Sequence, residues 1–338
     1  MSIKIQNRRY LGNKYKLLPF ITETIKKECT NVKSIADIFA GTGSFSSAYR
    51  DKIIYTNDIL YCNYICNHAW FGKEIISISK IKEIITEYNS LKVREKNYMT
   101  ENFSDTFFSF SVCSKIGFVR NDIEEKYHNR KINNRERSVL LMTLLYSMDK
   151  IANTCGHYDA FRQGVDLTNE IIFDIPEVDN KNNKYNKCFN MDANELVKII
   201  KPDLVYIDPP YNSRQYSDAY HLLENVARWE KPDVKGIARK MDRSNIKSKY
   251  CTKEATEIFK DLIDNISAKY IVLSYNNTGK KANDRSNARI SDKDIINILE
   301  NRGEVVKYSE DYKAFTAGKS KNLSNKERLF ICKIKKKK

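Results

Sequence analysis

Short apolar runs of the β type alternate along this chain with segments of helical periodicity. The apolar runs are four to six residues long, which is typical of strands buried on both faces of a sheet. We predict strands at residues 34–39, 53–56, 204–207, 270–274, 305–308 and 329–334, the last two as a hairpin. We predict helices at residues 17–28, 75–88, 137–151, 254–267 and 292–301. Strands separated by helices predict an α/β fold: a twisted, mostly parallel sheet with helices on both faces.

This alternation is interrupted between the second and third predicted strands. Residues 70–185 form a long, polar and mostly helical stretch in which Lys, Arg, Tyr and Phe are interleaved. We therefore predict a sheet domain made of residues 1–69 and 186–338, with residues 70–185 as an insertion. Residues 233–253 are a second polar segment, rich in Lys and Arg, which we interpret as a surface loop.

The composition favours a polyanionic partner. The chain has 59 Lys and Arg against 43 Asp and Glu, a formal net charge of +16, although a Lys- and Asn-rich proteome would also produce such a surface. The eight Cys include no C-x-x-C pair, which argues against a metal site and favours reduced thiols. The N-terminal residues lack an apolar core of signal-peptide length, and the longest apolar stretch, 139–148, is too short to cross a bilayer. We therefore expect a soluble protein of the bacterial cytoplasm, without a membrane partner.

A glycine-containing loop, DIFAGTGS at residues 37–44, follows the first predicted strand. Glycines let the backbone turn sharply and approach a ligand, and open parallel sheets bind ligands beyond the carboxyl ends of their strands. The loop lacks the third glycine of a dinucleotide fingerprint. Asp37 is placed to orient an amino group, and Asp58, after the second strand, to accept hydrogen bonds from two ribose hydroxyls. These features favour a nucleoside with a small charged tail; the alternative is a plain turn beside a surface acid.

The third predicted strand ends abruptly in Asp208-Pro209-Pro210-Tyr211. Prolines fix φ and donate no hydrogen bond, which leaves a stiff turn with the Pro209 carbonyl free beside the Asp208 carboxylate. Two fixed acceptors match an aromatic amine that carries two hydrogens, and they stabilise the positive charge that develops when the amine attacks. Tyr211 offers a ring on which a base that has left its duplex can stack. The alternative is a rigid turn without chemistry, because Pro-Pro is a common breaker.

These motifs resemble the Dam-like class of adenine-specific DNA methyltransferases, including the modification enzymes of FokI-type restriction systems. The resemblance runs from about residue 7 to residue 335 and is weaker in the middle. Residues 8–18, RRYLGNKYKLL, are similar to the leading cofactor motif of the family, and residues 274–277 and 326–331 are similar to a later pocket motif and the closing strand. The lysine motif comes first and the catalytic motif follows a long insertion, which is the order of this class.

The resemblance implies an S-adenosylmethionine-dependent methyltransferase fold of the Rossmann-like type, with a seven-stranded sheet. It implies that S-adenosyl-L-methionine is the cofactor, and that it is held by Tyr10, Lys14, Asp37, Phe39, Gly41, Gly43, Asp58 and Asp192. It implies no metal and a catalytic motif made of Asp208, Pro209, Pro210 and Tyr211, in which an aspartate at the head indicates an amino group of adenine as the target. In this scheme Tyr10 packs on the cofactor, Lys14 reaches its methionyl end or the target base, and Asp192 meets its adenine.

The expected function is therefore site-specific methylation of the exocyclic amine of a flipped adenine in duplex DNA. The insertion would recognise the DNA target, and a cognate restriction endonuclease would be a genetic rather than a physical partner. Two alternatives stay open: an RNA adenine or guanine methyltransferase, and a catalytically silent nucleic-acid-binding protein of the same fold. Residues 213–216 would close over the base or hold phosphates, or form an ordinary polar loop. A run of basic residues would contact the DNA backbone or form a solvated helix face: Arg120, Lys126, Arg130, Lys131, Arg135 and Arg137.

Overall fold

A seven-stranded sheet forms the centre of the molecule. The computed structural model describes residues 5, 10–181, 183–277, 289–311 and 326–335, and Arg8 and Arg9 of the leading motif lie outside these ranges. The strand order is β3-β2-β1-β4-β5-β7-β6, with β5–β7 and β7–β6 antiparallel and every other pair parallel. The strands are β1 (Ser34–Asp37), β2 (Ile53–Asn57), β3 (Lys187–Phe189), β4 (Leu204–Ile207), β5 (Tyr270–Asn277), β6 (Gly303–Asp311) and β7 (Lys326–Ile334). The expected seven-stranded, mostly parallel sheet with a C-terminal hairpin is confirmed.

Helices cover both faces of this sheet. Alternate residues of the central strands point to opposite sides: Ile35 and Leu204 pack with α1, whereas Ala36 and Val205 pack with α8, α11 and α12. This arrangement follows from the apolar runs, since a strand buried on both faces has no polar side. The helices beside the sheet are α1 (Leu18–Glu28), α2 (Ser44–Ser47), α3 (Tyr61–Phe71), α8 (Ala193–Ile199), α11 (Ala255–Asn265) and α12 (Asp292–Glu300).

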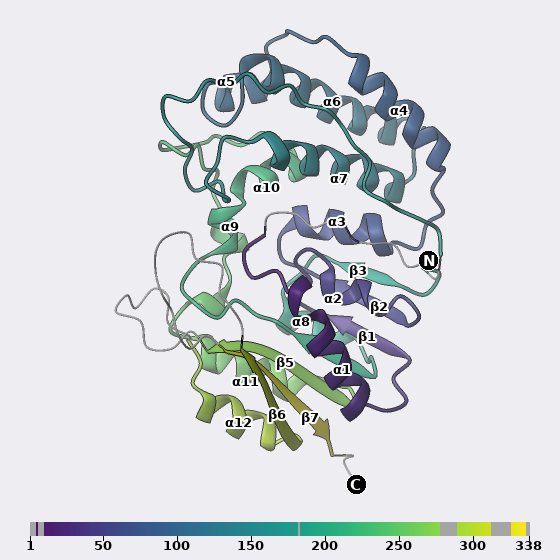
Figure 1. Cartoon of the computed structure of the whole chain (residues 1–338), viewed down its shortest axis with the longest axis vertical. Coiled ribbons are helices and arrows are strands. Elements are labelled where there is room, and N and C mark those ends of the chain that lie inside the picture. Colours follow the sequence, from purple (N-terminus) through teal and green to yellow (C-terminus); the bar gives the residue numbers. More distant parts are fainter. Residues whose placement is uncertain (1–4, 6–9, 182, 278–288, 312–325, 336–338) are drawn as a thin grey trace.

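A layer of helices lies beyond α3, at the end of the molecule opposite β6 and β7 (Figure 1). Its members are α4 (Ile78–Ser90), α5 (Tyr98–Phe103), α6 (Phe110–His128) and α7 (Asn134–Ile151), together with α9 (Tyr216–Ala219) and α10 (His221–Arg228), which follow β4 in the chain. Asn97 and Asn133 form capping boxes that start α5 and α7. The buried side chains of this layer, those of α10 included, form one continuous core with the side chains of α3. Between Ala152 and Asn186 the described residues form neither helix nor strand.

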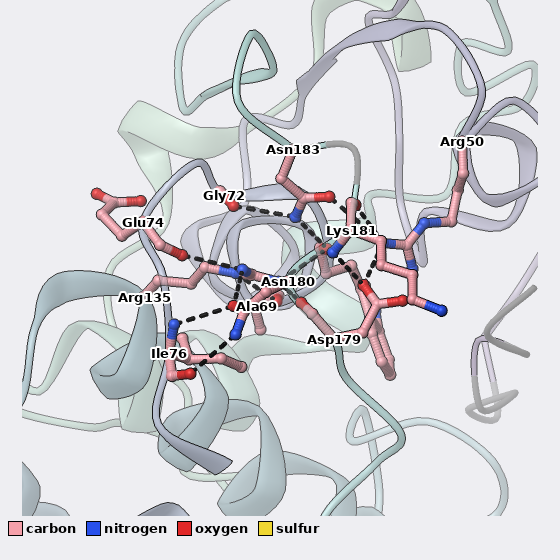
Figure 2. Close-up of polar contacts among 11 residues, drawn as sticks. Arg50, Ala69, Gly72, Glu74, Ile76, Arg135, Asp179, Asn180, Lys181 and Asn183 are labelled. Carbon is pink, nitrogen blue, oxygen red and sulfur yellow. Dashed lines mark hydrogen bonds and ion pairs between the residues drawn. The ribbon is translucent and has the colours of Figure 1, made fainter.

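Helix α3 joins the layer to the sheet, and buried charges from other elements hold both of its ends. At its start, the Glu224 carboxylate of α10 accepts hydrogen bonds of 2.9 Å from the Tyr61 and Cys62 amides. At its end, Arg135 of α7 donates to the Ala69 and Trp70 carbonyls (Figure 2). A negative charge at a helix start and a positive charge at its end both stabilise the helix dipole. These contacts fix α3 between the sheet and the insertion.

Three interpretations from the sequence need correction. Three of the six residues in the basic run form neither a phosphate-binding face nor a solvated one, because Arg120, Arg135 and Arg137 are at most 8% exposed. Arg120 donates to the Val226 and Ala227 carbonyls, so it braces α6 against α10. The segment 233–253 is more than a surface loop, because it carries buried residues: Met241, Ile246, Tyr250 and Cys251.

The third correction concerns elements that the sequence analysis missed, among them β3, α3, α6, α8 and α10. Helix α3 is buried nearly all round, so it shows no amphipathic period. Across the described ranges, no helix has the length and apolar character that crossing a bilayer requires.

Candidate active site

A cavity opens at the carboxyl ends of β1, β2 and β4, where open α/β sheets bind ligands. Its volume is about 1100 Å³ including the open mouth. Eleven of the twelve site residues expected from the sequence line it: Tyr10, Lys14, Asp37, Phe39, Gly41, Asp58, Asp192, Asp208, Pro209, Pro210 and Tyr211. The fold therefore brings together segments that are about 200 residues apart in the chain, since Tyr10 and Tyr211 line the same cavity.

The glycine loop after β1 takes its shape from two residues with positive φ. Gly41 has φ +50°, and a Cβ there would lie 3.2 Å from the Tyr10 ring, so glycine lets the aromatic ring approach the loop. Asn67 of α3 holds the same loop by donating to the Gly41 carbonyl at 3.0 Å. Gly43, the twelfth expected residue, is outside the cavity lining. With φ +75° and Asn67 Oδ1 2.8 Å from its Cβ position, Gly43 packs the loop against α3.

A buried acid, Asp37, ends β1, and a half-buried acid, Asp58, follows β2. Asp37 is 1% exposed, and its Oδ2 accepts a 2.9 Å hydrogen bond from Ser46. Its Oδ1 has no hydrogen-bond partner among the described residues, and burial raises the pKa of Asp37 to about 8. Asp58 accepts hydrogen bonds from the Gly41 amide at 2.9 Å and the Leu60 amide at 2.8 Å. Burial raises the pKa of Asp58 to about 6, against the lowering effect of these bonds.

The Asp208 carboxylate at the end of β4 is held by a lysine from the N-terminal segment. Lys14 Nζ lies 3.2 Å from Asp208 Oδ1 and 2.9 Å from Oε1 of Glu327 on β7. Burial lowers the pKa of Lys14, but the two carboxylates outweigh it and raise that pKa well above its usual value. Burial raises the pKa of Asp208 to about 7, and the nearby Lys14 charge opposes this rise. The cavity thus contains a carboxylate whose charge depends on one buried lysine.

Aromatic rings form much of the remaining wall. Tyr10 stacks on Tyr220 with ring centroids 4.7 Å apart, and on Tyr216 at 5.4 Å. Phe39 meets Tyr250 edge to face at 5.2 Å. Such rings offer flat apolar faces for purine ligands, and offset or edge contacts between them fix the width of the space. Tyr211, beside the two prolines, is partly buried and lines the same cavity.

Several cavity residues escaped the sequence analysis. Ile246, Ser248, Lys249 and Tyr250 form one wall, although the segment around them reads as polar loop. Gln215 ties this wall to the segment that follows Tyr211, because its side chain donates to the Ser248 carbonyl at 2.9 Å and accepts from the Ser248 amide at 2.8 Å. The segment 213–216 therefore contributes Gln215 and Tyr216 to the cavity rather than forming an ordinary polar loop. Asp192 is exposed at the rim and caps α8 by accepting from the Asn194 amide.

No group of three or more His, Cys, Asp or Glu in the described ranges is arranged to hold a metal ion. The eight cysteines are all free thiols. The acids, rings and loop of the cavity are instead of the kinds that hold a nucleoside-like organic ligand and a planar base.

Comparison with known proteins identifies the family. Residues 10–279 match the D12 class N6 adenine-specific DNA methyltransferases, so the chain belongs to this family. It is 37% identical over 314 residues to the modification methylase StsI of Streptococcus sanguinis, covering 86% of this chain and 46% of that protein. It is 32% identical to the type II methyltransferase M.NlaIII of Neisseria lactamica, covering 94% and 95%, and 32% identical to M.FokI of Planomicrobium okeanokoites, covering 80% and 45%. The chain thus spans about half the length of StsI and M.FokI and nearly all of M.NlaIII.

Proposed function

We propose that this chain transfers a methyl group from S-adenosyl-L-methionine to the exocyclic amine of a flipped adenine in duplex DNA. The observation that carries the proposal is the Asp208 carboxylate, which is held by Lys14 at the wall of a cavity shared with the glycine loop. An acceptor for the amine and the expected site of the methyl donor then face the same space.

The catalytic motif would activate the amine by accepting its hydrogens. The lone pair of an aromatic amine is delocalised into the base, so the nitrogen is a poor nucleophile. Hydrogen bonds from the amine to Asp208 and to the Pro209 carbonyl localise that lone pair and stabilise the positive charge that develops on nitrogen. Because β4 ends in two prolines, both acceptors are held before the base arrives, and little reorganisation is needed during the reaction.

The cavity residues fit the methyl donor. When bound, S-adenosylmethionine supplies a methyl group on a positively charged sulfur. The orphaned Oδ1 of Asp37 is an acceptor for its ammonium group, which would restore the charge that burial disfavours at this aspartate. Asp58 would accept from the ribose hydroxyls, Asp192 at the rim would meet the adenine, and Tyr10, Phe39 and Gly41 would contact the nucleoside. Gly43 would act through packing of the loop.

The target base must leave the duplex to reach Asp208. Tyr211, which follows the two prolines and lines the cavity, would stack on the flipped adenine and offset part of the cost of unstacking it. The net charge of +16 supports a DNA partner, because lysine and arginine neutralise phosphates. Methylation of host DNA would place the enzyme in the bacterial cytoplasm.

We further infer a role as the modification component of a restriction system, in which the endonuclease is a genetic partner. The relative StsI supports this role through its name as a modification methylase, and M.FokI and M.NlaIII through their names as type II methyltransferases. The insertion at residues 70–185 remains our candidate for recognition of the DNA sequence. Its shared core with α3 and α10 would couple a recognised sequence to the cavity, because α3 also holds the glycine loop.

Expression in a methylation-free bacterial host tests the proposal. We expect long-read sequencing to find N6-methyladenine at one short recognition sequence, and to find none in a host that expresses Asp208→Ala. An unmodified genome together with labelled methyl groups in RNA would favour the RNA alternative. A genome left unmodified by a folded protein that binds DNA would favour the silent binding protein.

A further inference from the structure

Glu327 is a carboxylate buried between the neighbours β5 and β6 of its strand, outside the lining of the cavity. It lies on β7, is 1% exposed, and stands opposite Asn276 in the register with β5. Three donors surround it: Ser274 Oγ at 2.7 Å, Lys14 Nζ at 2.9 Å and Asn276 Nδ2 at 3.2 Å. A buried charge is costly unless it is paired and hydrogen-bonded. Glu327 meets both conditions, with one ammonium and two neutral donors around it.

Lys14 connects this buried carboxylate to the reaction cavity. Its ammonium lies between Glu327, at 2.9 Å, and Asp208, at 3.2 Å, so one positive charge is shared by two carboxylates. Lysine has a long flexible side chain, and a single contact with Asp208 would leave it several positions. The shorter contact with Glu327 fixes the ammonium from behind, on the side away from the cavity.

We propose that Glu327 is a positioning residue for methyl transfer: it holds Lys14 against Oδ1 of Asp208 and so keeps Oδ2 of Asp208 available to the adenine amine. This inference rests on the proposed function. Glu327 itself touches neither substrate nor donor. Its effect passes through the place and the charge of Lys14, and its loss allows the ammonium to swing onto both oxygens of Asp208 and compete with the amine.

Lys14 and Glu327 affect the ionisation of Asp208 in opposite directions. Burial raises the pKa of Asp208 to about 7, the Lys14 charge lowers it, and the Glu327 charge raises it. The charge of Asp208 also interacts with Asp37 on β1 and with the hydroxyls of Tyr206 and Tyr216, and Tyr211 interacts with Lys14. Burial raises the pKa of Tyr206 and Tyr216 well above the usual value, so these two stay neutral through the range in which Asp208 titrates.

Two variants therefore separate positioning from simple structural support. In Lys14→Met the acidic limb of the methylation rate should move to higher pH, because Asp208 loses its cation. In Glu327→Gln the limb should move to lower pH, while the maximal rate falls by about one to two orders of magnitude because the ammonium is misplaced. Glu310→Gln is the matched control: Glu310 pairs with Glu327 in register but is exposed on the edge strand β6, so its variant should keep the wild-type rate and profile.

Single-turnover rates on duplex DNA at saturating S-adenosylmethionine should be measured across pH 5 to 9, since saturation removes the influence of Asp37 on donor binding. As a second readout, carbon NMR of the free protein with labelled aspartate, assigned with Asp208→Asn, follows the Asp208 carboxyl directly.

Opposite displacements of the Asp208 titration in Lys14→Met and Glu327→Gln would support the inference. A folded Glu327→Gln protein with an unchanged profile and rate, or displacements of the same sign, would overturn it. If Glu327→Gln does not fold, Ser274→Ala should still lower the maximal rate, and an unchanged rate would count against the inference. Absence of DNA methylation by the wild type would instead refute the proposed function.

Discussion

Two buried cations, Arg135 and Lys14, show how this fold uses charge in different ways. Arg135 is 1% exposed and donates to five neutral oxygens: the carbonyls of Ala69, Trp70, Glu74 and Asp179 and the side chain of Asn180. Lys14 is 7% exposed and lies between two carboxylates. Neutral acceptors satisfy the hydrogen bonds of a cation without another charge, so the cation holds the backbone segments that carry those acceptors in place. Carboxylate acceptors create charges whose ionisation depends on the cation, and one of them faces the cavity.

The surroundings of the two cations support this distinction. Burial lowers the pKa of Arg135 to about 10, which leaves the guanidinium charged at neutral pH. Asn180 and Asn183 complete its network by bonding the backbone at Ile76 and Gly72, so both side chains are tied to the chain at and after the end of α3 (Figure 2). We expect mutations in this region to change stability and those around Lys14 to change chemistry. The following predictions test that expectation, from the largest effect to the smallest.

The largest effect is expected at the cavity, from Asp208→Asn. The amide keeps the shape of the carboxylate but loses the charge that stabilises the reacting nitrogen, so single-turnover methylation should fall by roughly a thousandfold or more. The melting temperature should stay close to that of the wild type or rise, because a buried acid with a raised pKa is removed. A variant that keeps more than a tenth of the wild-type rate would show that Asp208 does not activate the amine.

On the structural side, Arg135→Met should produce the largest loss of stability. Methionine fills much of the space, but four carbonyls lose their donor, and we expect a loss of about 3 kcal/mol or more in the free energy of unfolding. Urea unfolding followed by circular dichroism measures this loss. The methylation rate per folded molecule should be unchanged, and the pH dependence of that rate should match that of the wild type. A stable variant with an altered pH profile would reverse the distinction between the two cations.

Glu224→Gln tests a buried carboxylate that serves structure alone. Glu224 is fully buried, accepts from two amides at the start of α3 and pairs with Arg228 at 2.7 Å. Glutamine can replace only one of the two acceptor oxygens and carries no charge for the helix dipole, so we expect a loss of about 1 to 2 kcal/mol in stability. The pH dependence of methylation should not move, in contrast to the shift expected for Glu327→Gln. A shifted acidic limb in Glu224→Gln would mean that any buried carboxylate in this protein alters the profile.

The sequence predicted the sheet well wherever strands are strongly marked. The third predicted strand, 204–207, matches β4 to the residue because an apolar run meets Asp208 and two prolines. Strand β3 has only three residues, none of them fully buried, so its sequence gives no strand signal. Helix α3 was missed because nine of its eleven residues are buried, which removes the polar face that a periodic pattern needs.

The site was predictable where motifs follow strands and unpredictable where distant elements meet. Asp37, Asp58 and Asp208 each end a strand, so topology alone brings them together. Glu327 acts across the antiparallel register of β5 and β7, which places it opposite Asn276, and no local pattern specifies that register. The basic residues were also unpredictable from local sequence. Arg135 and Lys131 lie in the same basic run, although Arg135 is buried and Lys131 is exposed.

Asp37→Asn should have the smallest effect, and one of opposite sign on stability. The folded state keeps the Asp37 proton up to a pKa of about 8, whereas an unfolded aspartate loses it near about pH 4. Stability from this group is therefore complete below about pH 4 and is lost as the pH rises through about 8. Asparagine has no charge to bury, so the variant should melt a few degrees above the wild type at pH 8 to 9 and lose this advantage toward pH 5.

The same substitution separates stability from donor binding. Oδ1 of Asp37 has no hydrogen-bond partner among the described residues, which is a cost that a bound ammonium group would remove. Calorimetric titration with S-adenosylmethionine should therefore show weaker binding to Asp37→Asn, even where the variant is more stable. If instead the two proteins melt in parallel across pH and bind the donor equally, Asp37 belongs with Arg135 as a purely structural charge. Asp208 and Lys14 would then be the charged residues of this comparison that take part in the reaction.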